Sequence, residues 1–182
     1  MNRLLIISTF IVLIADCLFA QGKDPLVKDI RSKYNEIRIN LNAYDTTTID
    51  IWGESAEGGL ATAYHDNEDI KLIEVIWFGE TGKRQVEYYF KGGNLIFAFN
   101  QNIYYNRPIF WDEEAAREDG DTEVFDLKKA KVSEDRYYFA NEELFLWLDN
   151  DKNEQDLRVA ANVAAAQDLI AHCYKMKAEL KK

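Results

Sequence analysis

The stretch Val86-Glu87-Tyr88-Tyr89-Phe90-Lys91-Gly92-Gly93-Asn94-Leu95-Ile96-Phe97-Ala98-Phe99 decides the fold. Two runs of aromatic and apolar residues flank a short turn with two glycines, which is the pattern of a β-hairpin. The pattern recurs 49 residues later, where Tyr137-Tyr138-Phe139 precedes Leu144-Phe145-Leu146-Trp147-Leu148. The sequence therefore predicts repeated hairpins.

A fainter copy of the hairpin lies 25 residues earlier, where Tyr64 takes the position of Tyr89 and Ile70 that of Leu95. Turn residues recur about every 10 to 14 residues, which favours an antiparallel meander over alternating strands and helices. We expect about six to eight strands built from these hairpins. The segments with strand-like composition are 46–52, 60–65, 70–78, 84–90, 94–101, 134–140 and 143–149.

Helical patterns flank the predicted sheet. Asp24 and Pro25 suit the N-cap and first position of a helix, and an apolar stripe at helical spacing follows as far as Leu41. A long alanine-rich helix is expected from about Glu154 to Leu180. The predicted fold class is α+β: an N-terminal helix, an antiparallel β-meander and a long C-terminal helix packed on the sheet. One face of the sheet should carry the helices; the other is either covered by more of the chain or left as an exposed aromatic platform.

The first twenty residues have the parts of an export signal. A short positive region ends at Arg3, residues 4–14 are mostly apolar, and Ala20 offers a small residue before Gln21. We expect a signal peptide at 1–20 and a single α+β domain at 21–182, located in the periplasm or secreted. The apolar run is too short to span a bilayer comfortably, so no transmembrane segment is expected in the mature chain. A buried N-terminal helix is the structural alternative.

Cys17 suggests an alternative location, in which a lipid anchors the chain to an envelope membrane. A bacterial lipoprotein is cut just before the cysteine that takes the lipid, and Ile14 and Ala15 suit such a signal, whereas Asp16 does not. Acylation of Cys17 would anchor the chain to an envelope membrane. Cleavage after Ala20 would instead leave Cys173 as the single cysteine, so the mature fold would stand without an internal disulfide.

The composition restricts the partners. The 182 residues carry a net charge of −10, and 13% of them are aromatic. An acidic protein repels phosphate, which argues against nucleic acid and anionic membrane surfaces. The charge permits a basic protein or a cation, and solubility alone would also explain it.

No segment has the spacing of a catalytic or cofactor site. His65 and His172 are the two histidines and lack metal-ligand spacing. His172 and Cys173 adjoin on the predicted final helix and diverge by about 100°, which argues against a Cys–His nucleophile pair. We find neither a nucleophile elbow nor a phosphate-binding glycine loop. The sequence therefore favours a binding protein without a cofactor over an enzyme, although scattered carboxylates leave a hydrolase as an alternative.

Two acidic segments raise the question of calcium. Asp149, Asp151 and Asn153 match the first ligand positions of a calcium loop, but Glu154 takes the glycine position and Ala160 that of the bidentate glutamate. We therefore predict no metal site. The segment 112–121 is a looser candidate for a cation, with a solvated polar loop as the alternative.

Aromatic side chains are the remaining candidates for a binding site. Tyrosine and tryptophan favour interfaces because each has an apolar body and a polar end. A recognition face on the sheet is one interpretation, and a filled core is the other. The residues predicted to bind a protein or small ligand are Tyr88, Tyr89, Tyr104, Tyr137, Tyr138 and Trp147.

The repeated Tyr-Tyr-Phe hairpins, together with an export signal that ends Phe19-Ala20 before Gln21, resemble uncharacterised exported proteins of Gram-negative bacteria. The resemblance covers roughly residues 60–148 and implies no assigned activity. The predicted meander and helix also look like bacterial enzyme-inhibitor modules, by architecture alone. We therefore expect an exported binding module, one version of which is an inhibitor of an envelope enzyme. A carboxylate-based hydrolase and a structural envelope protein are the alternatives.

Overall fold

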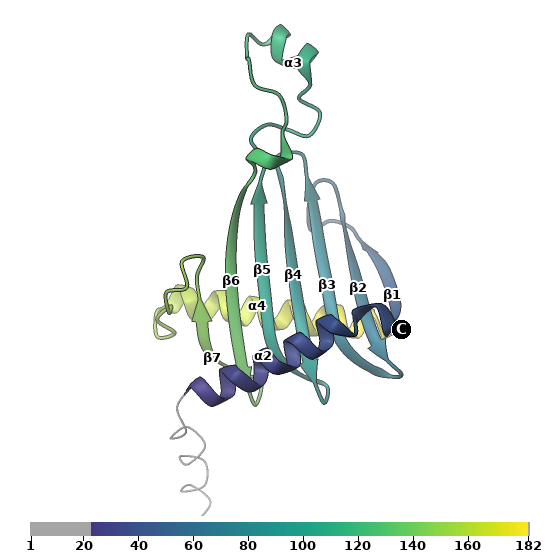
Figure 1. Cartoon of the computed structure of the whole chain (residues 1–182), viewed down its shortest axis with the longest axis vertical. Coiled ribbons are helices and arrows are strands. Elements are labelled where there is room, and N and C mark those ends of the chain that lie inside the picture. The colour runs from purple at the N-terminus through teal and green to yellow at the C-terminus, as the bar shows by residue number, and fades with distance from the viewer. Residues whose placement is uncertain (1–22, 182) are drawn as a thin grey trace, which may run out of the picture.

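The computed structural model describes residues 23–181, and the predicted signal peptide and Cys17 lie outside this range (Figure 1). Seven strands form one antiparallel sheet in which the spatial order is the chain order. The meander predicted from the hairpin spacing is therefore present. The strands are β1 (Asp45–Ile51), β2 (Gly59–Asp66), β3 (Asp69–Gly79), β4 (Gly82–Lys91), β5 (Asn94–Tyr104), β6 (Lys131–Ala140) and β7 (Glu143–Leu148).

The hairpin repeat of the sequence is also a repeat of backbone geometry. At the same place in each copy the ladder shifts register by one residue, which is the mark of a β-bulge. The turn after β4 has positive φ at Gly92 and Gly93, and the turn after β6 has positive φ at Asn141 and Glu142. The bulges fall between Tyr64 and His65, between Tyr89 and Phe90, and between Tyr138 and Phe139.

Two long helices cover opposite faces of the sheet. The N-terminal helix α2 (Lys23–Ile39) crosses one face and the C-terminal helix α4 (Ala160–Glu179) crosses the other (Figure 1). Helix α2 packs Val27, Ile30 and Ile37 into a core with Leu72, Tyr89, Phe97, Tyr138 and Leu146. The larger core lies under α4 and joins Leu169, Cys173 and Met176 to the alternate residues of the strands. The sheet is thus the middle layer of three. The expectation that one face carries the helices was wrong, because each face carries one.

Helix α4 begins later than the sequence indicated. Glu154, the expected start, instead forms an isolated bridge with Leu148. The reason is Asp149, because its Oδ1 accepts hydrogen bonds from the backbone N–H groups of Asp151 and Asn153 and turns the chain back. Asp24, the predicted N-cap, lies inside helix α2. Within residues 23–181, no helix combines the length and the apolar character needed to cross a bilayer.

The connection between β5 and β6 projects beyond the sheet, and we call residues 105–130 the arm (Figure 1). The acidic segment 112–121 contains the six-residue helix α3 (Glu113–Glu118). Asp112 caps α3 through hydrogen bonds from the backbone N–H groups of Glu114 and Ala115. A 3₁₀ turn, η2 (Leu127–Lys129), leads back into β6.

Candidate functional site

A cleft of about 620 Å³ opens between α4 and the sheet at the ends of β3 and β4 that lie nearer the arm, and we call it the aromatic cleft. Alternate residues of a strand point to the same face, so β3, β4 and β6 each contribute side chains to its floor. Helix α4 forms one wall, and the loop after β1 closes one end. The lining residues are Glu54, Trp77, Arg84, Tyr88, Tyr137, Ala165, Asp168, Leu169 and His172.

Glu54 and His172 organise a chain of polar contacts along this cleft. Glu54 Oε2 accepts a hydrogen bond from Trp77 Nε1 at 2.9 Å and lies 3.3 Å from His172 Nε2. The other nitrogen of His172, Nδ1, is 2.9 Å from the hydroxyl of Tyr88. Lys175 forms an ion pair with Glu54 Oε1 at 2.5 Å. These contacts join the loop after β1, two strands and α4 around one carboxylate.

Burial and these contacts set the protonation states in the cleft. Burial lowers the pKa of His172, and the opposing effect of Glu54 does not restore it. Burial also raises the pKa of Tyr88 and Tyr137 far above the ordinary value. Burial also raises the pKa of Glu54, but hydrogen bonds from Lys175 and Trp77 lower it overall. At neutral pH His172 is therefore a neutral imidazole, Tyr88 and Tyr137 are neutral phenols, and Glu54 is a carboxylate.

Arg84 supplies a cation at the opening of the cleft. Its guanidinium lies over the ring of Trp77, 5.0 Å from the centroid, in a cation–π arrangement. Its Nε donates to Asn100 Oδ1 at 2.8 Å. Among residues 23–181, its terminal nitrogens form no hydrogen bond or ion pair. The planar face of Arg84 is thus fixed on the indole while two of its nitrogens stay available to a ligand.

The structure separates the six residues that the sequence predicted as a binding face. Tyr88 and Tyr137 line the aromatic cleft, and Trp147 stacks beside Tyr137 with ring centroids 4.8 Å apart. Tyr89 and Tyr138 lie buried on the opposite face in the core under α2. Tyr104 is 56% exposed near the base of the arm. The six residues therefore do not share one face, and binding by the members of this set stays a prediction.

Trp147 is connected to the cleft through the hydrogen bonds of Asp135 and Asn100. Its Nε1 donates to Asp135 Oδ1 at 2.9 Å, and Asp135 Oδ2 accepts from Asn100 Nδ2 at 3.4 Å. Asn100 is the residue that holds Arg84. A predicted binding residue is thus linked through two polar side chains to the one cation that lines the cleft.

Sequence reasoning missed Glu54, Trp77, Arg84 and the site role of His172. They come from the loop after β1, from two strands and from α4, so no local motif joins them. One signal was present: the hairpin 70–90 places Trp77 directly opposite Arg84, and an aromatic–cation pair across two strands is a common stabilising contact. The tertiary position of α4 decides the rest.

The opposite face holds a smaller hollow of about 200 Å³ between α2 and the sheet. Beside it, the carboxylate of Glu87 is only 2% exposed. Arg38 Nη2 donates to Glu87 Oε1 at 2.7 Å, and the hydroxyl of Tyr89 donates to Oε2 at 2.5 Å. Every carboxylate oxygen there has a partner, so this cluster has the character of a structural ion pair.

Neither acidic segment has the geometry of a metal site. In the range that the structure describes, no group of three or more His, Cys, Asp and Glu side chains converges to hold an ion. Asp149 uses Oδ1 for the backbone turn described above and Oδ2 for Gln155.

No protein-family profile, no curated protein and no solved structure matches the chain.

Proposed function

We propose that this chain is an exported binding module that holds a small carboxylate ligand with a flat ring in the aromatic cleft. The observation that supports the proposal best is Arg84, stacked on Trp77 with its terminal nitrogens unpaired among the described residues. A guanidinium presents two parallel donors to a carboxylate, which makes arginine the usual residue for such recognition. Export rests on the sequence of residues 1–20.

The cleft has the composition of a ligand site. Most of its lining is aromatic or aliphatic, and a few charged groups converge on it, as in pockets that orient small molecules. Trp77 and Tyr137, both nearly buried, supply parts of the apolar wall, while Arg84 supplies positive charge. Asp168, exposed on α4, is placed to accept from a hydroxyl or amino group of the same ligand.

The polar groups of the cleft favour binding over acid–base catalysis. Both oxygens of Glu54 and both nitrogens of His172 are already used in contacts within the protein. Burial raises the pKa of Tyr88, so its hydroxyl remains protonated and cannot serve as a base. A hydrolase that works with a pair of carboxylates would need two that are free to exchange protons with the substrate, whereas Asp168 is the one carboxylate of the cleft lining that is not already held by contacts within the protein. The alternative of a carboxylate-based hydrolase is therefore the weaker one.

A titration with matched small molecules tests the proposal. The probes are 4-hydroxybenzoate and 4-hydroxybenzamide, which have the same shape and differ in charge, and the readout is the amide spectrum of the isotope-labelled protein. We expect the carboxylate to shift signals from residues around Arg84 and His172, and the amide to bind at least about tenfold more weakly, because it lacks the charge-assisted pair.

Two variants provide the control. Arg84→Gln removes the cation and should abolish the difference between the two probes. Lys83→Gln removes a neighbouring positive charge whose side chain points to the other face of β4, so the difference should remain. Equal binding of both probes, or a loss of binding in both variants alike, would contradict the proposal, as would the failure of a panel of ring carboxylates to bind.

A further inference from the structure

Exposed apolar side chains gather at the arm, away from the lining of the aromatic cleft. Among residues 23–181, eleven large apolar residues are exposed, and six of them lie in the arm or in the strand ends beside it: Phe78, Tyr104, Ile109, Phe110, Leu127 and Val132. Scattered apolar residues on a surface need no explanation, whereas a cluster marks an interaction site. The arm is therefore the strongest candidate for a second contact surface.

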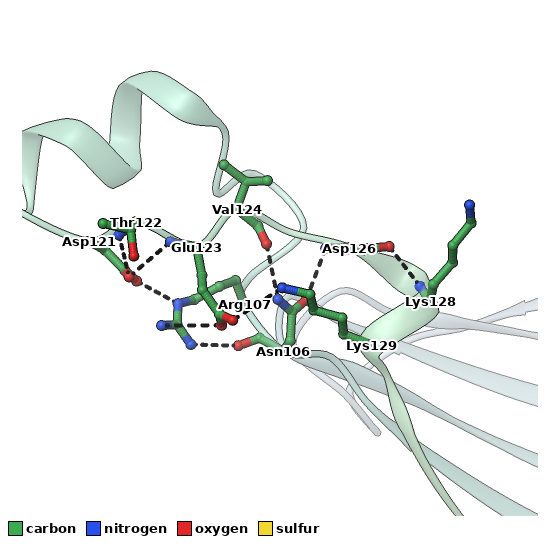
Figure 2. A network of polar contacts seen from close by, with 9 residues as sticks. All are labelled: Asn106, Arg107, Asp121, Thr122, Glu123, Val124, Asp126, Lys128 and Lys129. Carbon is green, nitrogen blue, oxygen red and sulfur yellow. Dashed lines mark hydrogen bonds and ion pairs between the residues drawn. The ribbon is translucent and has the colours of Figure 1, made fainter.

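Hydrogen bonds and ion pairs join the two legs of the arm at its base, as Figure 2 shows. The side-chain amide of Asn106 donates to the carbonyl of Val124 at 3.0 Å and accepts from the backbone N–H of Asp126 at 2.9 Å. Arg107 Nε donates to Asp121 Oδ2 at 2.6 Å, and Asp121 Oδ1 accepts from two backbone N–H groups. The two legs of the arm are thus clamped together, and such pre-organisation lowers the entropy lost on binding.

The arm is also hydrogen-bonded to the turn between β3 and β4. The backbone N–H of Tyr105 donates to the carbonyl of Thr81, and that of Ile109 donates to the carbonyl of Glu80, both at 2.9 Å. Farther out, the N–H of Phe125 donates to the carbonyl of Trp111 at 2.8 Å. The apolar residues are therefore presented from a fixed backbone.

Charges are distributed unevenly along the arm. At its base, Asp121 and Glu123 form ion pairs with Arg107, and Glu123 also pairs with Lys129 (Figure 2). At its tip, residues 112–119 contain five carboxylates and one arginine, a net charge of −4. None of those five forms an ion pair with another residue in the described range. The tip thus keeps a concentrated negative charge that a basic partner would neutralise.

A hollow of about 400 Å³ adjoins this charge. Ile109 and Phe110, both more than half exposed, form part of its wall together with Trp111, Val124 and Phe125, and Asp112 and Glu113 lie on its rim. Trp111 Nε1 is buried without an acceptor among the described residues. An apolar hollow with a carboxylate rim matches a segment that carries an apolar side chain between basic ones.

We propose that the arm is a docking surface for a basic polypeptide segment of another protein, which places an apolar side chain in the hollow and lysine or arginine against the acidic tip. Charge complementarity selects this occupant, because nucleic acid and anionic lipid would both be repelled. The surface uses none of the residues that line the aromatic cleft, so the two sites are tested independently.

Three peptides of equal length provide the test, each titrated into the isotope-labelled chain while amide signals are followed. The peptides are Lys-Lys-Leu-Phe-Lys-Lys, Glu-Glu-Leu-Phe-Glu-Glu and Lys-Lys-Ser-Ser-Lys-Lys, all blocked at both ends. The first should shift signals from residues 109–113 and 124–125, and added salt should weaken it. The second should leave these signals unchanged, and the third should bind at least about tenfold more weakly than the first because it lacks the apolar side chains.

Exposed positions supply variants that retain the fold, which the same spectra verify. Phe110→Ser should weaken the first peptide by about tenfold. Glu113→Gln should weaken it by about two- to fivefold, the range of an exposed ion pair. The matched control is Glu68→Gln, at the opposite end of the sheet in the turn between β2 and β3, which should leave binding unchanged.

Four results would each overturn the proposal: no shift with the first peptide, shifts that map away from the arm, equal binding of the acidic peptide, or equal effects of the Phe110 and Glu68 variants.

Discussion

Tyr88 and Tyr89 are neighbours in the chain, yet their side chains lie on opposite faces of the sheet and form hydrogen bonds there. The hydroxyl of Tyr88 lies 2.9 Å from His172 Nδ1 on α4, whereas that of Tyr89 donates to Glu87, the partner of Arg38 on α2. Both rings are almost fully buried. One dipeptide of the central hairpin thus ties β4 to both helices.

Removing the two hydroxyl groups should have unequal effects on stability. Tyr88→Phe deletes a hydrogen bond to a neutral imidazole and should lower the free energy of unfolding by about 1 kcal/mol. Tyr89→Phe leaves a buried carboxylate oxygen without its donor and should lower it by about 2 to 3 kcal/mol. Urea unfolding followed by tryptophan fluorescence measures both, and a larger loss for Tyr88→Phe would contradict this account.

The Arg38–Glu87 pair should behave as a unit. Arg38→Met leaves the carboxylate of Glu87, 2% exposed, without its cation, and should lower the free energy of unfolding by about 3 kcal/mol. The double variant Arg38→Met with Glu87→Met removes both charges and should recover a good part of that loss. A double-mutant cycle in urea gives the coupling energy. If the double variant is as unstable as the sum of the single ones, the two side chains do not act together.

His172 should make stability depend on pH. Burial lowers its pKa from the ordinary value of 6.5, so the unfolded chain takes up a proton at a pH where the folded chain does not. Stability should therefore fall as the pH is lowered from 6.5 through the pKa of the folded state. His172→Gln should flatten this part of the curve. Urea midpoints at a series of pH values test it, and an unchanged slope in the variant would assign the dependence to another group.

The sequence sufficed for the sheet because its signals are local. The hairpin from Tyr88 to Phe97 specifies its register by alternation and by the Gly92-Gly93 turn, and the copies at Tyr64 and Tyr138 repeat its bulge. The strands follow one another in space, so chain order alone gave the topology. The start of α4 was placed too early, because the side chain of Asp149 overrides the helix propensity of the residues that follow.

The residues of the aromatic cleft were harder to predict from the sequence. Alternation along a strand places Tyr88 and Tyr89 on opposite faces, which the prediction of one recognition face did not take into account, and it could not tell which face α4 would cover. Glu54 lies in an irregular loop, 118 residues from its partner His172. Such residues come together only when α4 packs on the sheet, and the periodicity of a single sequence does not reveal where a helix packs.

The turn between β6 and β7 holds a non-glycine residue in a left-handed backbone conformation, and glycine at that position would relieve the strain. Glu142 has φ of 67°, where the corresponding turn after β4 uses Gly93. A side chain in this conformation costs about 1 kcal/mol relative to glycine. Glu142 also accepts a hydrogen bond from the hydroxyl of Tyr174, so its replacement has two effects. In a Tyr174→Phe background, Glu142→Gly should therefore raise the free energy of unfolding by about 1 kcal/mol, as measured in urea. No gain in that background would place the strain elsewhere.

Cys173 should report on the docking of α4. Its thiol is fully buried, and burial raises the pKa to about 12, so the folded protein presents neither access nor thiolate to an alkylating reagent. Labelling with iodoacetamide at neutral pH should be slower in the folded chain than in urea by at least about a thousandfold. Mass spectrometry of the peptide that contains Cys173 measures the rate independently of Cys17. Met176→Ala, which opens a cavity in the core beneath α4, should accelerate the labelling, whereas Gln167→Ala on the exposed side of the helix should not. Rapid labelling of the folded wild-type chain would show that α4 leaves the sheet far more often than its packing predicts.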